Sequence, residues 1–317
     1  MATVNSVLGP VTGDKLGFTL VHEHVSVSSA GIPQVFPEFI DRQGTIDVAV
    51  KQLRSAFEEG VRTIVDVTTM DLGRDIRLLE EVSRLSGVQI IPCTGTWLDI
   101  PRVLGAASPD VVADLYTREI DAGIEGTGIR AGIIKVANDA TGVSREGEVI
   151  LRAAARASLR TGVRITTHTD AQARIGEQQI RIFEDEGVDL PNVCIGHSNN
   201  TTDTDYLIGI AAKGAYVGMD HYPGGRRPGT PNWEERTSVL SDLIKAGVGD
   251  RLLLSHDNLV TVTPANREER EQRLQYNPDV YSFVSRKVLP RLRELGVTDK
   301  AIHDITVENP RRFLTGS

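Results

Sequence analysis

Two histidines close the stretch GFTLVHEHV, residues 17–25, which otherwise reads as a buried β-strand. His22 and His24 are two residues apart, so on a strand they project from the same face and can bind one metal ion. Glu23 then points the other way, and we expect it to support a ligand or to face a helix. A single histidine at a strand end is more often a packing residue, so the metal hypothesis requires further ligands elsewhere in the chain.

Further polar residues follow other apolar runs of the sequence. They are Lys135, His168, His197, Asp220, His221, His256 and Asp257. Six of the 7 histidines therefore stand at the ends of strand-like runs, and the set is large enough for two metal ions. The remaining one, His303, lies outside the series and is predicted to be a surface or packing residue.

Lys135 is the unusual member of this set, because an ammonium group is a poor neighbour for metal cations. A neutral lysine amine can add carbon dioxide and become an anionic carbamate whose two oxygens bridge a metal pair. The surrounding histidines favour this interpretation. A lysine of lowered pKa that forms a Schiff base is one alternative. A structural lysine at the rim of the fold is the other.

Eight short apolar runs are predicted to be the strands that position these residues. They are residues 18–25, 62–69, 88–97, 131–138, 164–170, 193–198, 215–222 and 251–257. Amphipathic segments alternate with them and predict eight helices, at 45–59, 74–86, 109–124, 145–161, 176–186, 203–213, 233–246 and 281–295. This count and alternation predict one (β/α)₈ TIM barrel domain over residues 1–317. A two-domain α/β chain fits less well, because no linker interrupts the series.

The carboxyl ends of the strands of such a barrel meet at one mouth, so side chains far apart in the sequence can form one site there. Two long connections, at about 222–232 and 258–280, follow the last two strands and are predicted to rise over that mouth as substrate loops. The second contains the charged run 266–273, which is predicted to be a solvated helical face.

The composition limits the possible partners. A chain of 317 residues with 40% hydrophobic and 25% charged residues is typical of a soluble globular protein. The net charge of −8 argues against nucleic-acid binding. No run resembles a signal peptide or a membrane span, so no membrane partner is expected. Cys93 and Cys194 lie in apolar runs and are predicted to be reduced core residues, which indicates a cytoplasmic protein.

An ordered set of motifs runs through the predicted strands: GFTLVHEHV, GVRTIVDVTT, TGIRAGIIKVA, TTHT, CIGHS, MDHYP and SHD. Together they closely resemble the bacterial phosphotriesterase family of the amidohydrolase superfamily. The resemblance extends from VNSVLGPVTGDKLGFTLVHEHV near the start to ITVENPRRFL near the end. It implies a hydrolase with two divalent metal ions and a carbamylated lysine. The metal ligands that it implies are His22, His24, Lys135, His168, His197 and Asp257.

The resemblance also implies how the ligands divide between the two ions. His22, His24 and Asp257 would bind the more buried ion. His168 and His197 would bind the more exposed one, with the carbamate and a hydroxide bridging the pair. Zinc is the expected metal, and cobalt, manganese and iron are alternatives for such nitrogen and oxygen ligands.

The resemblance implies a catalytic role for Asp257 and His221, since the aspartate would accept a proton and pass it towards the histidine. Many members of the family carry an acidic residue three positions after the histidine of the sixth strand, where this chain has Asn200. An amide cannot accept a proton at neutral pH. The relay is therefore expected to end at His221 or to take another route.

Two aromatic residues, Trp97 and Tyr222, are predicted to line the substrate pocket. Trp97 and His221 resemble the phosphotriester-hydrolysing members more than the lactonases, which usually carry a tyrosine and an arginine there. The short loop after the seventh strand and the sequence Asn-Leu-Val-Thr-Val after Asp257 do not resemble the best-known phosphotriesterases. Packing in the core is the alternative role for Trp97.

The leading hypothesis is a metal-dependent hydrolase that cleaves organophosphate triesters (aryl dialkyl phosphates) by attack of the metal-bridging hydroxide, with promiscuous activity towards aryl esters and lactones. The first alternative is a lactonase, acting on acyl-homoserine or other lactones, with promiscuous phosphotriesterase activity. A Schiff-base lyase that uses Lys135 and a non-catalytic ligand-binding barrel are the others. The expected partner is a small-molecule ester, and the resemblance implies a homodimer.

Overall fold

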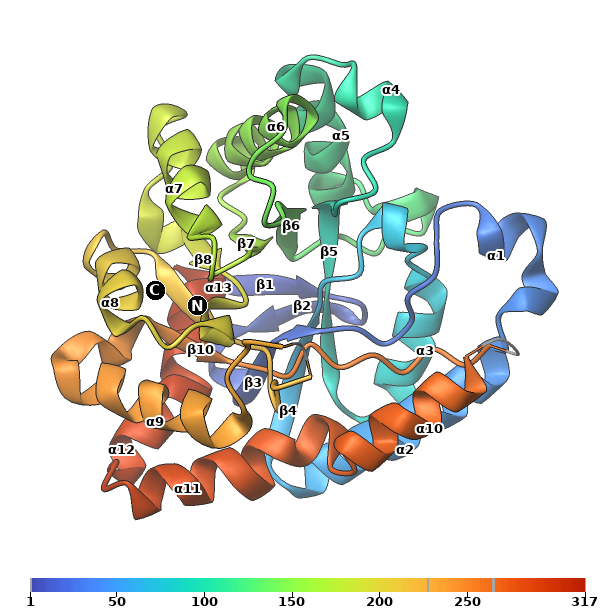
Figure 1. Ribbon diagram of the computed structural model, residues 1–317. Coiled ribbons are helices and arrows are strands. Elements are labelled where there is room, and N and C mark those ends of the chain that lie inside the picture. The colour runs from blue at the N-terminus through green and yellow to red at the C-terminus, as the bar shows by residue number, and fades with distance from the viewer. Residues whose placement is uncertain (1, 227, 264–265, 317) are drawn as a thin grey trace.

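Eight parallel strands form the centre of the fold in the computed structural model, which describes residues 2–226, 228–263 and 266–316. Each strand pairs with the next one along the chain. Their bounds are β3 Phe18–Glu23, β4 Val61–Asp66, β5 Gln89–Thr96, β6 Ile133–Ala137, β7 Ile165–His168, β8 Val193–Ile195, β9 Tyr216–Met219 and β10 Leu252–Leu254. Each overlaps one predicted segment, so the eight predicted strands are confirmed (Figure 1).

Backbone hydrogen bonds between β3 and the chain after β10 close the barrel. The amide of Asp257 donates to the carbonyl of His22 at 3.0 Å, and the amide of His24 donates to the carbonyl of Asn258 at 2.9 Å. The predicted (β/α)₈ barrel is therefore confirmed. The closure also places Asp257 beside the two histidines of the first barrel strand.

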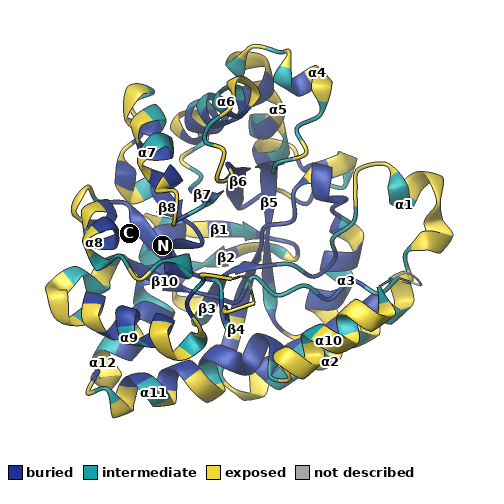
Figure 2. Ribbon diagram, in the orientation of Figure 1, coloured by how far each residue is buried: buried dark blue, intermediate teal, exposed yellow. Residues whose placement is uncertain are grey.

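Helices surround the barrel and turn their buried faces to it, while their outer faces are exposed (Figures 1 and 2). They overlap the eight predicted helical segments. Their bounds are α2 Arg42–Glu58, α3 Ile76–Ser86, α5 Pro109–Asp121, α6 Arg145–Thr161, α7 Ile175–Asp185, α8 Thr204–Ala212, α9 Trp233–Leu243 and α11 Leu289–Glu294. Side chains cap several N-termini: Asp75 accepts from the amide of Leu78 at α3, and Ser144 accepts from the amide of Gly147 at α6.

The remaining elements were not predicted, apart from α10 in the charged run. They are the hairpin β1 Thr3–Ser6 and β2 Gly9–Thr12, and the helices α1 Ile32–Val35, α4 Arg102–Gly105, α10 Arg267–Tyr276, α12 Asp299–His303 and α13 Asn309–Thr315. The hairpin covers the amino-terminal end of the barrel. Val7 donates its amide to the carbonyl of Ile90, and Asn5 donates its side-chain amide to the carbonyl of Ala131. A site for a ligand is left at the opposite end, where the strands finish.

Several smaller sequence predictions can also be compared with the structure. No residue of α10 is buried, as its charged sequence predicts. Cys93 and Cys194 are buried and free, and the His303 side chain is 59% exposed. Residue 227 of the first predicted substrate loop and residues 264–265 of the second lie outside the described residues. Among those that are described, no helix has both the length and the apolar character to cross a membrane.

Candidate metal centre

The histidines of β3 meet Asp257 at the carboxyl end of the barrel. His22 is 1% exposed, and its Nε2 lies 3.7 Å from Oδ1 of Asp257. The Nε2 of His24 lies 3.2 Å from the same oxygen, and its Nδ1 hydrogen-bonds to the hydroxyl of Thr68 at 2.8 Å. One ligand atom from each of the three residues lies within 4.8 Å of the others. The predicted ligands of the more buried ion are therefore together, with the geometry of a metal site.

Asp220, which follows β9, orients two of the histidines. Its Oδ2 lies 3.1 Å from Nδ1 of His22, and its Oδ1 lies 3.0 Å from Nδ1 of His197. Burial would raise the pKa of Asp220, but the two imidazoles outweigh burial and hold that pKa below its ordinary value. The ionised carboxylate accepts hydrogen bonds only, so each Nδ1 carries the proton and each Nε2 offers its lone pair. The Nε2 atoms are thus the ones that face a metal.

Asp220 is one of the polar residues at the predicted strand ends, but no role in the site was predicted for it. The sequence signal is limited to the side of the strand: Asp220 stands two residues after Gly218 and so shares its face. The packing agrees, since a Cβ on Gly218 would collide with the Asp220 carboxylate. Within a barrel an inward carboxylate must be paired, and His22 of β3 and His197, which follows β8, are the partners of Asp220.

Lys135 lies on β6 with its side chain among the histidines. Its Nζ is 2.8 Å from Nε2 of His22, and the side chain is fully buried. Burial lowers the pKa of Lys135 to about 8, although the charges of Asp257 and Asp220 oppose this effect. At pH 7 about a tenth of the amine is therefore unprotonated, and the fraction rises to about half at pH 8. A neutral buried amine that points at ligand nitrogens suits the carbamate interpretation of the sequence.

His168, at the end of β7, packs against His197 with ring centroids 4.5 Å apart. Burial, together with the charges of His197 and Lys135, keeps the pKa of His168 well below its ordinary value. The structure groups His197 with His221 and Asp257 rather than with His168, since one ligand atom of each of those three lies within 4.8 Å of the others. His168 therefore borders the site through ring contacts and lies outside the three-residue groups found in the described part of the chain.

Two of these ligand candidates have a left-handed backbone, which is uncommon for residues other than glycine. His197 has φ of 53° and Asp257 has φ of 58°. Hydrogen bonds hold both residues there, because Asp220 Oδ1 accepts from the amide of His197 at 2.7 Å and the carbonyl of His22 accepts from the amide of Asp257 at 3.0 Å. Such strain is often found at functional sites, where the surroundings enforce it.

Glu23 points away from the metal ligands, as strand alternation predicts, and binds the chain after β10. Its Oε1 accepts from the hydroxyl of Ser255 at 2.7 Å and from the amide and Nδ1 of His256 at 3.0 and 2.7 Å. Its Oε2 accepts from the amide of Asn258 at 2.9 Å. Nε2 of His256 in turn accepts from the amide of Val284. Glu23 thereby fixes the segment that carries Asp257, and His256 is a packing residue.

A cavity of about 540 Å³ opens beside these groups, at a size typical of small-molecule sites. Its lining includes His168, His197, His221 and Asp257 together with residues of the two long loops. The predicted pocket residue Tyr222 belongs to this lining, but its side chain is only 1% exposed. The predicted substrate loops therefore do border the site.

Trp97 is not among the described residues that line the cavity. Its ring meets that of His168 edge-on, with centroids 5.7 Å apart, and its amide donates to both oxygens of Asp71 at 3.0 Å. Asn200, which stands where an acidic residue was expected, does line the cavity. The neighbouring Asn199 accepts from the amide of His221 at 3.2 Å and so positions that residue.

The donor set suits divalent metal ions. Burial and the charge of Lys135 lower the pKa of His22 to about 3, and burial lowers the pKa of His221 to about 4, so both are neutral at pH 7 and can donate a lone pair. The neighbouring imidazoles of His197, His24 and His22 outweigh the effect of burial and keep the pKa of Asp257 well below its ordinary value. Imidazole nitrogens with a carboxylate are ligands that zinc and related ions prefer.

Comparison with known proteins agrees with this geometry. The model of the phosphotriesterase family matches residues 2–314. A phosphotriesterase homology protein of Mycobacterium tuberculosis is 38% identical over 99% of this chain and 98% of its own length. An aryldialkylphosphatase of Saccharolobus solfataricus is 35% identical over 95% of each chain. An N-acetyltaurine hydrolase of Dictyostelium discoideum is 29% identical over 85% of this chain and 73% of its own. The chain belongs to the phosphotriesterase family.

Proposed function

We propose that the protein is a hydrolase with two divalent metal ions, zinc in the first place, that cleaves organophosphate triesters such as aryl dialkyl phosphates. The observation that carries the proposal is the convergence of His22, His24, His197 and His221 on Asp257, which lines the cavity together with His197 and His221. When bound, the two cations would lower the pKa of a water molecule and polarise the phosphoryl or carbonyl oxygen of the substrate.

The protein's own residues supply the proton path. Asp257 is ionised and lies within 4.8 Å of a ring nitrogen of His221, which makes these two residues the candidates for the relay. His221 is neutral at pH 7, and its buried Nδ1 has no hydrogen-bond partner among the described residues. Asn200 cannot continue the path. We propose that the relay ends at His221.

We propose that Lys135 is carbamylated in the active protein and supplies the anionic ligand between the two ions. Its lowered pKa and its position 2.8 Å from a ligand nitrogen of His22 support this. An ammonium at that distance would repel a cation, whereas a carbamate would bind one. Dependence of metal uptake on bicarbonate is the direct consequence.

The lactonase is the second candidate, because the same donor set acts on carbonyl and phosphorus centres alike. The names of the relatives indicate that similar chains act on different substrates, since one relative is an aryldialkylphosphatase and others are N-acetyltaurine hydrolases. Tyr222 is largely buried and Trp97 reaches the cavity through His168, so neither residue decides between a phosphotriester and a lactone.

A parallel hydrolysis assay tests the proposal. Protein expressed with zinc and bicarbonate is given paraoxon, 4-nitrophenyl acetate, an acyl-homoserine lactone, a γ-lactone and a δ-lactone. We expect turnover of paraoxon that is lost in the His22→Asn/His24→Asn double variant. Turnover of lactones alone would replace the first candidate by the second. Borohydride trapping of a carbonyl compound on Lys135, with no turnover of any ester, would instead support a Schiff-base lyase.

We further propose a cytoplasmic homodimer that binds no nucleic acid or membrane. The net charge of −8 opposes binding to the phosphate backbone of nucleic acids, and no described helix is long and apolar enough to cross a membrane. Light scattering on the purified protein would measure twice the 34.5 kDa chain mass for a dimer.

A further inference from the structure

A buried arginine lines the same cavity without a charged partner. Arg236 lies on α9 and is 1% exposed. Its Nε donates to the carbonyl of Pro231 at 2.7 Å, whereas its buried Nη1 has no hydrogen-bond partner. Within the described residues no carboxylate lies within ion-pair distance of this guanidinium. Burying an unpaired cation costs free energy, and an anion bound from outside the chain would offset that cost.

The loop after β9 packs directly against this guanidinium beside the cavity. Gly224 has φ of 71°, and a Cβ there would collide with the guanidinium of Arg236. Both residues line the cavity. Burial lowers the pKa of Arg236 to about 10, so the side chain stays charged at neutral pH. The site is therefore a positive, partly unsatisfied donor fixed by the loop in front of it.

The charges around the cavity are divided between its sides. Besides Asp257 of the metal centre, the acidic residues of the lining are Asp139 and Asp170, which follow β6 and β7. Arg226, Arg236 and Arg273 come from the two long loops and from α9 and α10. Arg273 is paired with Glu269 at 2.6 Å, and Arg226 lies over the ring of Tyr276 at 5.7 Å. Of these three arginines, Arg236 is thus the one with neither a carboxylate nor an aromatic ring as partner.

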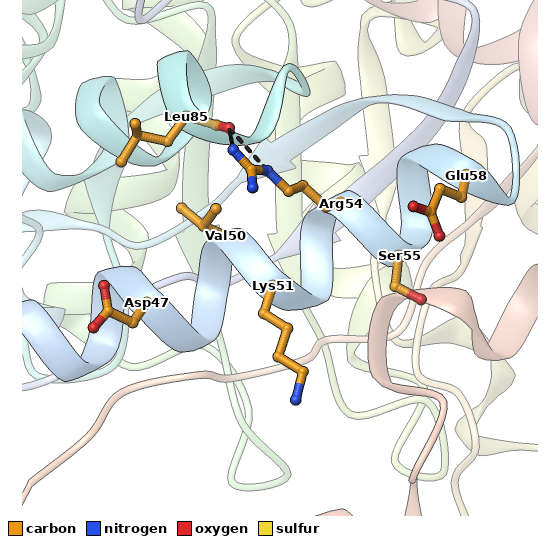
Figure 3. Close-up of a pocket in the computed structure, with 7 residues that line it drawn as sticks. All are labelled: Asp47, Val50, Lys51, Arg54, Ser55, Glu58 and Leu85. Carbon is orange, nitrogen blue, oxygen red and sulfur yellow. Dashed lines mark hydrogen bonds between the residues drawn. The ribbon is translucent and has the colours of Figure 1, made fainter.

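A second hollow of the surface also contains an arginine and provides a comparison with Arg236. This hollow is a groove of about 440 Å³ between α2 and α3, and its arginine is Arg54 (Figure 3). Its Nε and Nη2 both donate to the carbonyl of Leu85, at 3.1 and 2.8 Å. The guanidinium of Arg54 is exposed to solvent and donates to a backbone carbonyl, so it does not need an anion as a partner.

We propose that Arg236 binds an anionic group of the substrate, a carboxylate or a sulfonate remote from the bond that is cleaved. The proposal rests on the proposed function, because the metal centre and Arg236 share one cavity. It narrows the substrate class to esters, lactones or amides whose acyl or leaving group ends in an organic anion. Among phosphotriesters it favours those that carry such an anion, because a neutral one would leave Arg236 unpaired and would be bound less tightly.

Two aryl esters with the same scissile bond test the proposal: mono(4-nitrophenyl) glutarate, which carries a free carboxylate, and its methyl ester, which is neutral. We expect the wild type to prefer the anionic ester. In Arg236→Met the KM for the anionic ester should rise roughly ten- to hundredfold, which is the effect of losing a hydrogen bond to a charged group. The kcat for the anionic ester, and both KM and kcat for the neutral ester, should change little. Arg236→Lys should keep part of the preference, and Arg54→Met should keep all of it.

Binding of butanesulfonate, measured by calorimetry, tests the same residue without turnover. Sulfonates are weak metal ligands, so binding to wild type that is lost in Arg236→Met reports on the arginine. If neither ester is cleaved but butanesulfonate binds in this way, the anion site stands and the proposed function fails. A purely structural arginine would lower the stability of Arg236→Met and affect both esters equally. That result, or a wild type without anionic preference and without sulfonate binding, overturns the proposal.

Discussion

Replacement of Asp220 by asparagine isolates the carboxylate that orients the metal-facing histidines. In the native site Asp220 accepts from Nδ1 of His22, from Nδ1 of His197 and from the amide of His197, at 3.1, 3.0 and 2.7 Å. An asparagine has one carbonyl oxygen, which can serve the two donors of His197. Its NH₂ group then faces Nδ1 of His22, which must become an acceptor.

The consequence for His22 is a change of tautomer. With Nδ1 accepting, the ring proton moves to Nε2, and this nitrogen can no longer bind a metal ion. Replacement of such orienting partners typically weakens metal binding by about 10- to 100-fold, or about 1.4–2.8 kcal/mol. We expect Asp220→Asn to lose zinc affinity by that factor at the site that uses His22.

Competition with a chromophoric zinc chelator measures this change. Asp250→Asn is the matched control, since it makes the same change at an aspartate whose side chain is 56% exposed and which belongs to none of the candidate metal-binding groups of the described residues. Circular dichroism shows whether the variants fold. Zinc affinity of Asp220→Asn equal to that of wild type and control would refute the reasoning that the carboxylate fixes the tautomer of His22.

The remaining predictions concern the lysine, the buried glutamate and pH. Bicarbonate should raise the zinc occupancy of the wild type and should have no effect on that of Lys135→Ala. Metal analysis at two bicarbonate concentrations checks this, and an equal rise in the two proteins would contradict carbamylation. Glu23→Ala leaves four donors without their acceptor and should lower the free energy of unfolding by about 3 kcal/mol or more in urea titration. In metal-depleted protein, acid should destabilise the fold between pH 6.5 and about 4. His221 becomes protonated below about pH 6.5 in the unfolded chain but only below about pH 4 in the folded site. The free energy of unfolding should therefore fall by about 3 kcal/mol across this range. Thermal melting of wild type and His221→Asn checks the slope, and equal slopes would contradict it.

The residues that could be predicted from the sequence are those whose positions follow from strand periodicity. Spacing alone places His22 and His24 on one face, and the order of the strands brings Asp257 beside them once the barrel closes. The structure confirms the strands and the closure. Placement at a strand end identifies a candidate ligand, but it does not show which way a ring nitrogen points.

What could not be predicted depends on pairing between strands and on loop conformation. Asp220 has its role because two imidazoles on other strands reach it, and no local pattern records that contact. His256 has the sequence position of a ligand, yet Glu23 and the amide of Val284 occupy both of its nitrogens. Arg236 has the sequence pattern of an ordinary helix residue, and no local pattern shows that Gly224 packs against its guanidinium beside the cavity.

Metal content of the purified protein is the most direct test of the central claim. The protein is expressed with zinc and bicarbonate, and zinc per chain is measured by mass spectrometry for wild type and for the His22→Asn/His24→Asn variant. The site predicts about two zinc ions per wild-type chain and a clear loss in the variant. Less than one ion per wild-type chain, or equal content in both proteins, would contradict a binuclear centre built on these residues.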